Sequence, residues 1–166
     1  TADIYGGGLY ANGNTAVELT GNTIAENAGT SAGAGGAYAT GGTFTVANTI
    51  IALNTGGAAF ANGFALGGGA ATFTCNDVFG NATADYSGVP DPTGTAGNIA
   101  LDPLFCAAGN YDLKATSPCH PDNSGSCGLI GALNGGSCVS AVPGEDDGAV
   151  PLVFRVDQAF PNPFNP

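Results

Sequence analysis

Five cysteines and one histidine are the residues of this sequence most suited to covalent or metal chemistry. The cysteines are Cys75, Cys106, Cys119, Cys127 and Cys138. Their spacing does not match the CxxC pairs of zinc sites, and His120 is the single histidine. Disulfides formed in an oxidising compartment are therefore the better interpretation. His120 follows Cys119 directly, but neighbours in sequence rarely have catalytic geometry, so we expect a loop histidine beside a disulfide.

The disulfide pairing stays open at this point. Five is an odd number, so two bridges leave one thiol over, and each choice of the unpaired cysteine allows three pairings of the others. We favour a bridge between Cys119 and Cys127, because both lie in one turn-rich stretch.

The acidic residues raise the question of carbohydrate chemistry. A glycoside hydrolase needs two carboxylates about 5–9 Å apart, and a lyase needs a basic residue beside an acidic Ca²⁺ site. Asp77, Asp85 and Asp91 can meet near the loop 82–98, and Asp85, Asp91 and Asp102 can bind Ca²⁺ weakly, but no calcium-binding motif is present. Solvated loop acids are the expected alternative. We predict that the chain is not an enzyme and has no cofactor and no metal site.

Three aromatic residues recur in Gly-rich bursts that precede the repeats described below. Tyr10, Tyr38 and Phe60 can form a stack that binds sugar rings, but a purely structural aromatic ladder is the commoner outcome. We expect the structural ladder.

Charge and composition exclude several classes of partner. Lys114 and Arg155 are the only basic residues against thirteen acids, for a net charge of −11. Nucleic-acid binding needs a basic surface, so no nucleic-acid partner is expected. No apolar run approaches the roughly 18 residues of a membrane-spanning helix, so no membrane insertion is expected.

The elements that must position these residues come from an internal repeat. Three segments align, at residues 16–27, 44–54 and 73–81, and their first asparagines are Asn22, Asn48 and Asn76. The spacing is 26 and then 28 residues. Before each asparagine, apolar and polar residues alternate, as in a strand with one buried face.

Stacked coils are the architecture that such short strands require. A strand of a few residues cannot bury a face alone, but coils laid on one another at roughly 4.8 Å per step pair their backbones and align equivalent side chains. The fold class predicted is all-β, a right-handed parallel β-helix of about four coils with a disulfide-stabilised C-terminal end and an extended tail. Asn22, Asn48 and Asn76 should form one vertical row at a corner. The alternative, a β-sandwich, predicts turns every 8–12 residues without a period near 27.

The repeat loosens after residue 81. A loop at 82–98 leads to a last partial coil that should include residues 111–113, and residues 128–133 should close it. The cysteines gather here because a solenoid end lacks a neighbour on one side. The predicted organisation is a β-helix with its closing region at 1–138, an acidic linker at 139–150 and the start of a new segment at 151–166.

Two parts of the chain resemble known families. The motifs at 75–81, 102–105, 117–119 and 127–132 resemble the closing coils of right-handed parallel β-helix repeat proteins with the pectate-lyase-like fold, many of which environmental bacteria secrete. The stretch 154–166, ending in Pro161-Asn162-Pro163-Phe164-Asn165-Pro166, resembles the opening of the Ig-like sorting domain of type IX secretion. That domain normally continues for several more strands. The resemblance implies an extracellular or cell-surface location.

The predicted function is therefore that of an extracellular structural or adhesive protein. An open solenoid end is a template for pairing, so copies of the chain are expected to stack end to end into a filament unless upstream coils cover it. Residues 152–156 are a candidate strand for pairing with a neighbour's sheet edge. The alternative is a carbohydrate-binding module or the remnant of a polysaccharide lyase or hydrolase. A groove with two acids and an aromatic platform would favour that alternative, with surface polysaccharide as the partner.

Overall fold

The computed structural model describes residues 7–13, 16–29, 33–56, 60–133 and 138. The predicted linker at 139–150, the segment at 151–166 with its resemblance to a sorting domain, and the strand expected at 152–156 lie outside the described residues.

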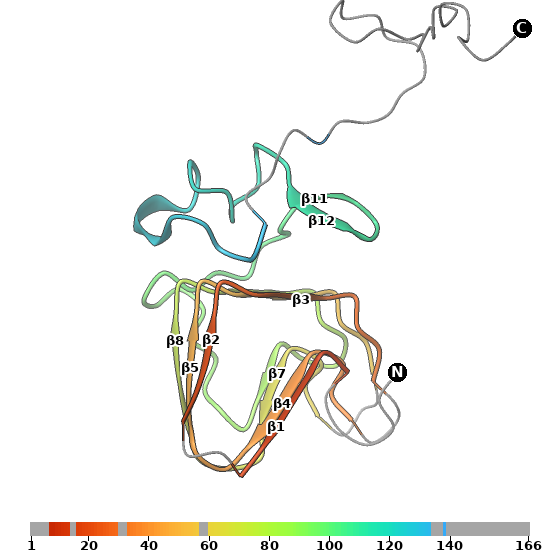
Figure 1. The fold of residues 1–166 in the computed structure, drawn as a ribbon, viewed down its shortest axis with the longest axis vertical. Helices are drawn as coiled ribbons and strands as arrows, with labels where there is room; N and C mark the ends of the chain where they lie inside the picture. Colours follow the sequence, from red (N-terminus) through yellow and green to blue (C-terminus); the bar gives the residue numbers. More distant parts are fainter. Residues whose placement is uncertain (1–6, 14–15, 30–32, 57–59, 134–137, 139–166) are drawn as a thin grey trace, which may run out of the picture.

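The chain passes three times through the same three directions, and each pass adds one strand to each of three parallel sheets (Figure 1). We call one such pass a coil. The first coil contains β1 (Leu9–Asn12), β2 (Ala16–Thr20) and β3 (Thr23–Ala25). The second contains β4 (Ala37–Thr40), β5 (Thr43–Ala47) and β6 (Ile50–Ala52), and the third contains β7 (Phe64–Leu66), β8 (Ala70–Thr74) and β9 (Asp77–Phe79). The sheets have the orders β1-β4-β7-β10, β2-β5-β8 and β3-β6-β9, where β10 is Tyr86–Ser87. A fourth coil is only begun, by β10 and by a bridge from Asp77 to Ile99.

Buried and exposed side chains alternate along the strands, which explains why these segments adopt the extended conformation. In β5, Phe44 and Val46 are buried while Thr43 and Thr45 are exposed. The buried side chains of all three sheets meet inside the coils in one core, to which Phe64 and Ile51 also belong. The predicted period-2 pattern is confirmed here.

The register is 27 residues throughout the β2-β5-β8 and β3-β6-β9 sheets, which corrects the predicted asparagine row. Thr20 pairs with Ala47, and Ala47 pairs with Thr74. The residue in line with Asn22 and Asn76 is therefore Thr49 and not Asn48. The sequence alignment on the first asparagine of each repeat was wrong by one residue in the second coil.

Asn48 occupies a different column, whose residues turn the chain. Gly21, Asn48 and Cys75 follow β2, β5 and β8, and their φ angles are +65°, +48° and +55°. A residue in the left-handed conformation turns the chain from one sheet into the next, and glycine and asparagine adopt this conformation most readily. The left-handed backbone thus explains asparagine at position 48, whereas Asn76 bonds to the neighbouring coils through its side chain.

The remainder of the described chain, residues 99–133, is called the closing segment here. It contains an antiparallel hairpin of β11 (Phe105–Ala107) and β12 (Asn110–Leu113) and a short 3-10 helix at Gly125–Cys127. The prediction that residues 111–113 belong to a last coil is wrong, because β12 pairs only with β11. Figure 1 shows the closing segment outside the coils, next to β3.

The closing segment covers the outer face of the β3-β6-β9 sheet. Leu113, Cys119 and Ile130 form a second core with Ile50 and Ala52 of β6. This explains why β6 is buried on both faces. The sequence predicted a cap on the end of the coils, and the structure places these residues on their flank.

The coarse prediction of an all-β protein with parallel sheets and disulfides is confirmed. The described residues contain no α-helix. In that part of the chain, no helix is long and apolar enough to cross a membrane.

Candidate functional site

The cysteines form two disulfides, one of which attaches the closing segment to the coils. Cys75 is bonded to Cys127 and Cys106 to Cys138, with Cα–Cα distances of 5.4 and 5.3 Å. Cys119 is a free, buried thiol. The predicted bridge between Cys119 and Cys127 is therefore wrong. Cys75 lies at a corner and is bonded to the closing segment, whereas Cys119 is packed in the second core.

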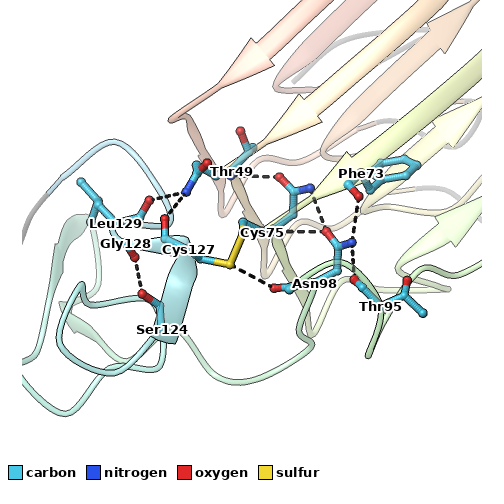
Figure 2. Close-up of a disulfide and its surroundings, with 12 residues drawn as sticks. Thr49, Phe73, Cys75, Thr95, Asn98, Ser124, Cys127, Gly128 and Leu129 are labelled. Carbon is cyan, nitrogen blue, oxygen red and sulfur yellow. Dashed lines mark hydrogen bonds between the residues drawn. A yellow bond between two sulfur atoms is a disulfide. The ribbon is translucent and has the colours of Figure 1, made fainter.

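Asn48 holds the same segment without a covalent bond. Its Nδ2 donates to the carbonyl oxygens of Cys127 and Leu129, at 2.8 and 2.9 Å, and its own carbonyl accepts from the N–H of Gly131. Figure 2 shows Cys127 and Leu129 beside the disulfide. Two neighbouring residues of one corner column, Asn48 and Cys75, thus fix the closing segment to successive coils.

Gly97 is required by this disulfide. It continues the corner column with φ +76°, and a Cβ there would lie 2.5 Å from the Sγ of Cys127 and 2.9 Å from that of Cys75. No side chain fits at this position unless the bridge moves.

We call the turn from β2 to β3, and the equivalent turns from β5 to β6 and from β8 to β9, the first corner. This corner carries a ladder of polar side chains through successive coils. The backbone N–H of Asn22 donates to Thr49 Oγ1, that of Thr49 to Asn76 Oδ1 and that of Asn76 to Asn98 Oδ1, at 3.0–3.3 Å. Asn76 Nδ2 donates to Asn98 Oδ1 and to the carbonyl of Val46. Asn98 Nδ2 then donates to carbonyls at Phe73 and Thr95, which ends the ladder (Figure 2).

A second ladder with the same kind of hydrogen bonds lies at the second corner, which follows β3, β6 and β9. Asn27 donates to Asn54 and Asn54 to Asn81, each through both the backbone N–H and Nδ2. Asn81 donates in the same two ways to Oδ1 of Asp85. The carboxylate of Asp85 is thus the terminal acceptor of a one-way chain of hydrogen bonds, and the role predicted for it as a loop acid is incomplete.

Asp77 is the acid whose ionisation the fold affects most. Its side chain is fully buried. Oδ1 accepts the N–H of Leu101, and Oδ2 lies 3.1 Å from Cys119 Sγ. Burial is the main cause that raises the pKa of Asp77 from 3.8 to about 6, and hydrogen bonds to Cys119 and Leu101 oppose it. The same burial, together with the charge of Asp77, raises the pKa of the Cys119 thiol, so it is an unreactive sulfhydryl.

The remaining candidates for chemistry have separate local partners. Asp91 and Asp102 each accept a backbone N–H two residues further on, in turns. His120 Nδ1 accepts the N–H of Asp122. No group of three His, Cys, Asp or Glu side chains suited to a metal ion occurs among the described residues.

The aromatic ladder is present. Tyr10 and Tyr38 stack with ring centroids 5.8 Å apart and planes 3° from parallel, and Phe60 lies 4.8 Å from Tyr38. Stacking covers the ring faces that a sugar would contact, which favours the structural interpretation.

A shallow cavity of about 330 Å³ lies between the second corner and the closing segment. Glu26, Asp102 and Lys114 line it together with Leu53, Leu104 and Phe105. Nearby, Tyr111 of β12 donates its hydroxyl to Glu26 Oε2 at 3.2 Å. The sequence analysis missed this site. Glu26, Leu53 and Gly80 each precede an asparagine of the second ladder, but nothing in the sequence indicated that residues 102–114 fold against them.

Comparison of the chain with protein-family models, with curated proteins and with solved structures finds no match.

Proposed function

We propose that this chain contains the C-terminal coils of a right-handed parallel β-helix, and that the protein has a structural or adhesive role outside the cell rather than a catalytic one. The observation that carries the proposal is the repeated register: successive strands pair at 27 residues in the β2-β5-β8 and β3-β6-β9 sheets, and at 28 and then 27 residues along β1-β4-β7. Equivalent residues then stack in columns, as a solenoid requires.

The polar groups of the fold are engaged in stabilising it. Asn54, Asn76 and Asn98 are buried and bonded within the two ladders. On the β2-β5-β8 sheet the exposed side chains are mostly alanine and threonine, and Glu18 is the single acid on its strands. A smooth surface of this kind favours a scaffold over a lyase or hydrolase groove.

The disulfides support the proposed location. Two bridges among the described cysteines indicate an oxidising, non-cytoplasmic compartment. The resemblance of residues 154–166 to a sorting domain supports export to the cell surface.

The two ends of the stack differ, and this bears on self-association. The edge of β7 is paired by β10, and the edge of β9 is contacted by Ile99. The edges of β1, β2 and β3 have no further strand among the described residues. At the other end β8 also has no further strand in the described part of the chain, so end-to-end stacking of copies would bring the first coil of one copy against β8 of the next. Upstream coils of the same chain would attach at the first coil.

Antibodies against the purified chain test the location, and incubation of the chain with polysaccharides tests the role. We expect them to label intact source cells, and we expect the purified chain to release no oligosaccharide from neutral or acidic polysaccharides. Labelling only after lysis would contradict the surface location, and release of oligosaccharides would contradict the non-catalytic role.

A further inference from the structure

The cavity at the second corner has walls of two kinds. Leu53, Leu104 and Phe105 supply apolar surface, while the charged ends come from residues far apart in the chain: Glu26, Asp102 and Lys114. Lys114 is one of only two basic residues in the whole sequence. The volume of about 330 Å³ is within the range of small-molecule sites.

The backbone around the cavity is unusual. Glu26, Leu53 and Leu104 have φ angles of +54°, +58° and +52°, a region that residues other than glycine adopt rarely. The third coil makes the same turn with Gly80, at φ +64°. The turn therefore does not require a side chain, and costly conformations of this kind persist mainly where the side chain is used.

The first corner supports this interpretation. There the left-handed residues with side chains, Asn48 and Cys75, both have a defined use, because they bind the closing segment. At the second corner Glu26 accepts a bond from Tyr111, but Leu53 remains 36% exposed. The hairpin thus contacts this corner at Glu26 and leaves Leu53 as a wall of the cavity.

We propose that this cavity binds a neutral sugar unit of a polysaccharide. A sugar hydroxyl both donates and accepts, so it can donate to Glu26 or Asp102 and accept from Lys114. The C–H face of the ring can pack on Leu53 and Phe105. Two carboxylates against one lysine, on a chain of net charge −11, disfavour acidic sugars.

The site is held ready for a ligand. The disulfide from Cys75 to Cys127 attaches the closing segment to the coils, and the bond from Tyr111 to Glu26 holds β12 against the first coil. A preformed site loses little conformational freedom on binding. The inference rests on the adhesive part of the proposed function and gives it a ligand class.

Titration of the oxidised chain with neutral disaccharides tests the proposal. The probes are cellobiose, maltose and mannobiose, each followed by shifts of backbone amide resonances. For a shallow, exposed site we expect a Kd of about 1 mM for at least one probe. The shifts should concentrate at residues 26, 53, 102–108 and 114.

Two variants separate binding from folding. Leu53→Gly removes an apolar wall but relieves the left-handed conformation, so the thermal midpoint should stay unchanged or rise while the Kd increases tenfold or more. Glu26→Gln should weaken binding by about tenfold, the effect of one hydrogen bond to a charged group. The matched controls are Glu18→Gln, an exposed acid on β2, and Leu101→Ala, an exposed leucine outside the cavity lining.

Two kinds of result would overturn the inference. One is the absence of saturable shifts with all three sugars, whether or not an organic amine such as spermidine binds. The other is sugar binding that Leu53→Gly and Glu26→Gln leave unchanged. None of these results bears on surface labelling, so the scaffold proposal stands or falls separately.

Discussion

Replacing Asn76 by alanine tests the ladder as the main polar stabiliser of the coils. Asn76 is fully buried; its Oδ1 accepts the N–H of Thr49, and its Nδ2 donates to the carbonyl of Val46. The substitution leaves both backbone groups buried without these partners. Each such group costs about 1–3 kcal/mol, so we expect Asn76→Ala to lower the free energy of unfolding by about 2–6 kcal/mol.

The matched control is Asn22→Ala, at the exposed start of the same column. Within the described part of the chain, the Nδ2 of Asn22 donates to the carbonyl of Thr20, in an exposed position where water can replace it. We expect a loss below about 1 kcal/mol.

Urea unfolding of the oxidised protein measures both variants. With a slope of about 2 kcal/mol per molar urea, a loss of 4 kcal/mol moves the midpoint by about 2 M. Equal midpoints for Asn76→Ala and Asn22→Ala would refute the view that position in the ladder, rather than the amide itself, determines the contribution.

Three further predictions concern the same region. The pKa of Asp77 is raised from 3.8 to about 6, so the folded state binds the proton more tightly than the unfolded state and stability should fall as pH rises from about 4 to 6. The variant Asp77→Asn should lose this pH dependence and should be more stable than the parent chain at pH 7 by about 3 kcal/mol. Equilibrium unfolding measured across this pH range tests both expectations. Thr49→Asn should complete the first ladder, raise the free energy of unfolding by about 1 kcal/mol and so raise the urea midpoint. A lower midpoint would mean that the packing of the threonine contributes more than the hydrogen bonds of the added amide. Replacing Cys75 and Cys127 together by serine opens a loop with a sequence separation of 52 and should cost about 4 kcal/mol, whereas an unchanged thermal midpoint would show that Asn48 alone holds the segment.

The repeat and its alternating strands could be predicted from the sequence because both are local patterns. Phe44 and Val46 alternate with threonines, and the structure buries them as expected. The three aligned segments also end in asparagine, and these residues, Asn27, Asn54 and Asn81, form the second ladder.

The assignment of Asn48 failed for a physical reason. Two adjacent positions at one corner both favour asparagine, one because the backbone is left-handed and the other because an amide bridges coils. The second coil has asparagine in the first position and threonine in the second, so an alignment by residue type chose the wrong one.

The disulfides and the cavity could not be predicted, because they depend on where residues 99–133 fold back. Cys75 meets Cys127 only since the closing segment lies along the flank of the coils. No local pattern near Leu53 or Lys114 indicates that they share a cavity.

The attachment of the closing segment has a consequence for the export that we propose. The β3-β6-β9 sheet keeps an apolar outer face, including Ile50, until residues 113–130 arrive to cover it. A chain that crosses a membrane from its N-terminus delivers these residues after all three coils have emerged. We therefore expect the coils to remain pliable, and vulnerable to proteases, until Cys127 reaches the oxidising side, so that translocation and locking of the fold occur in a fixed order.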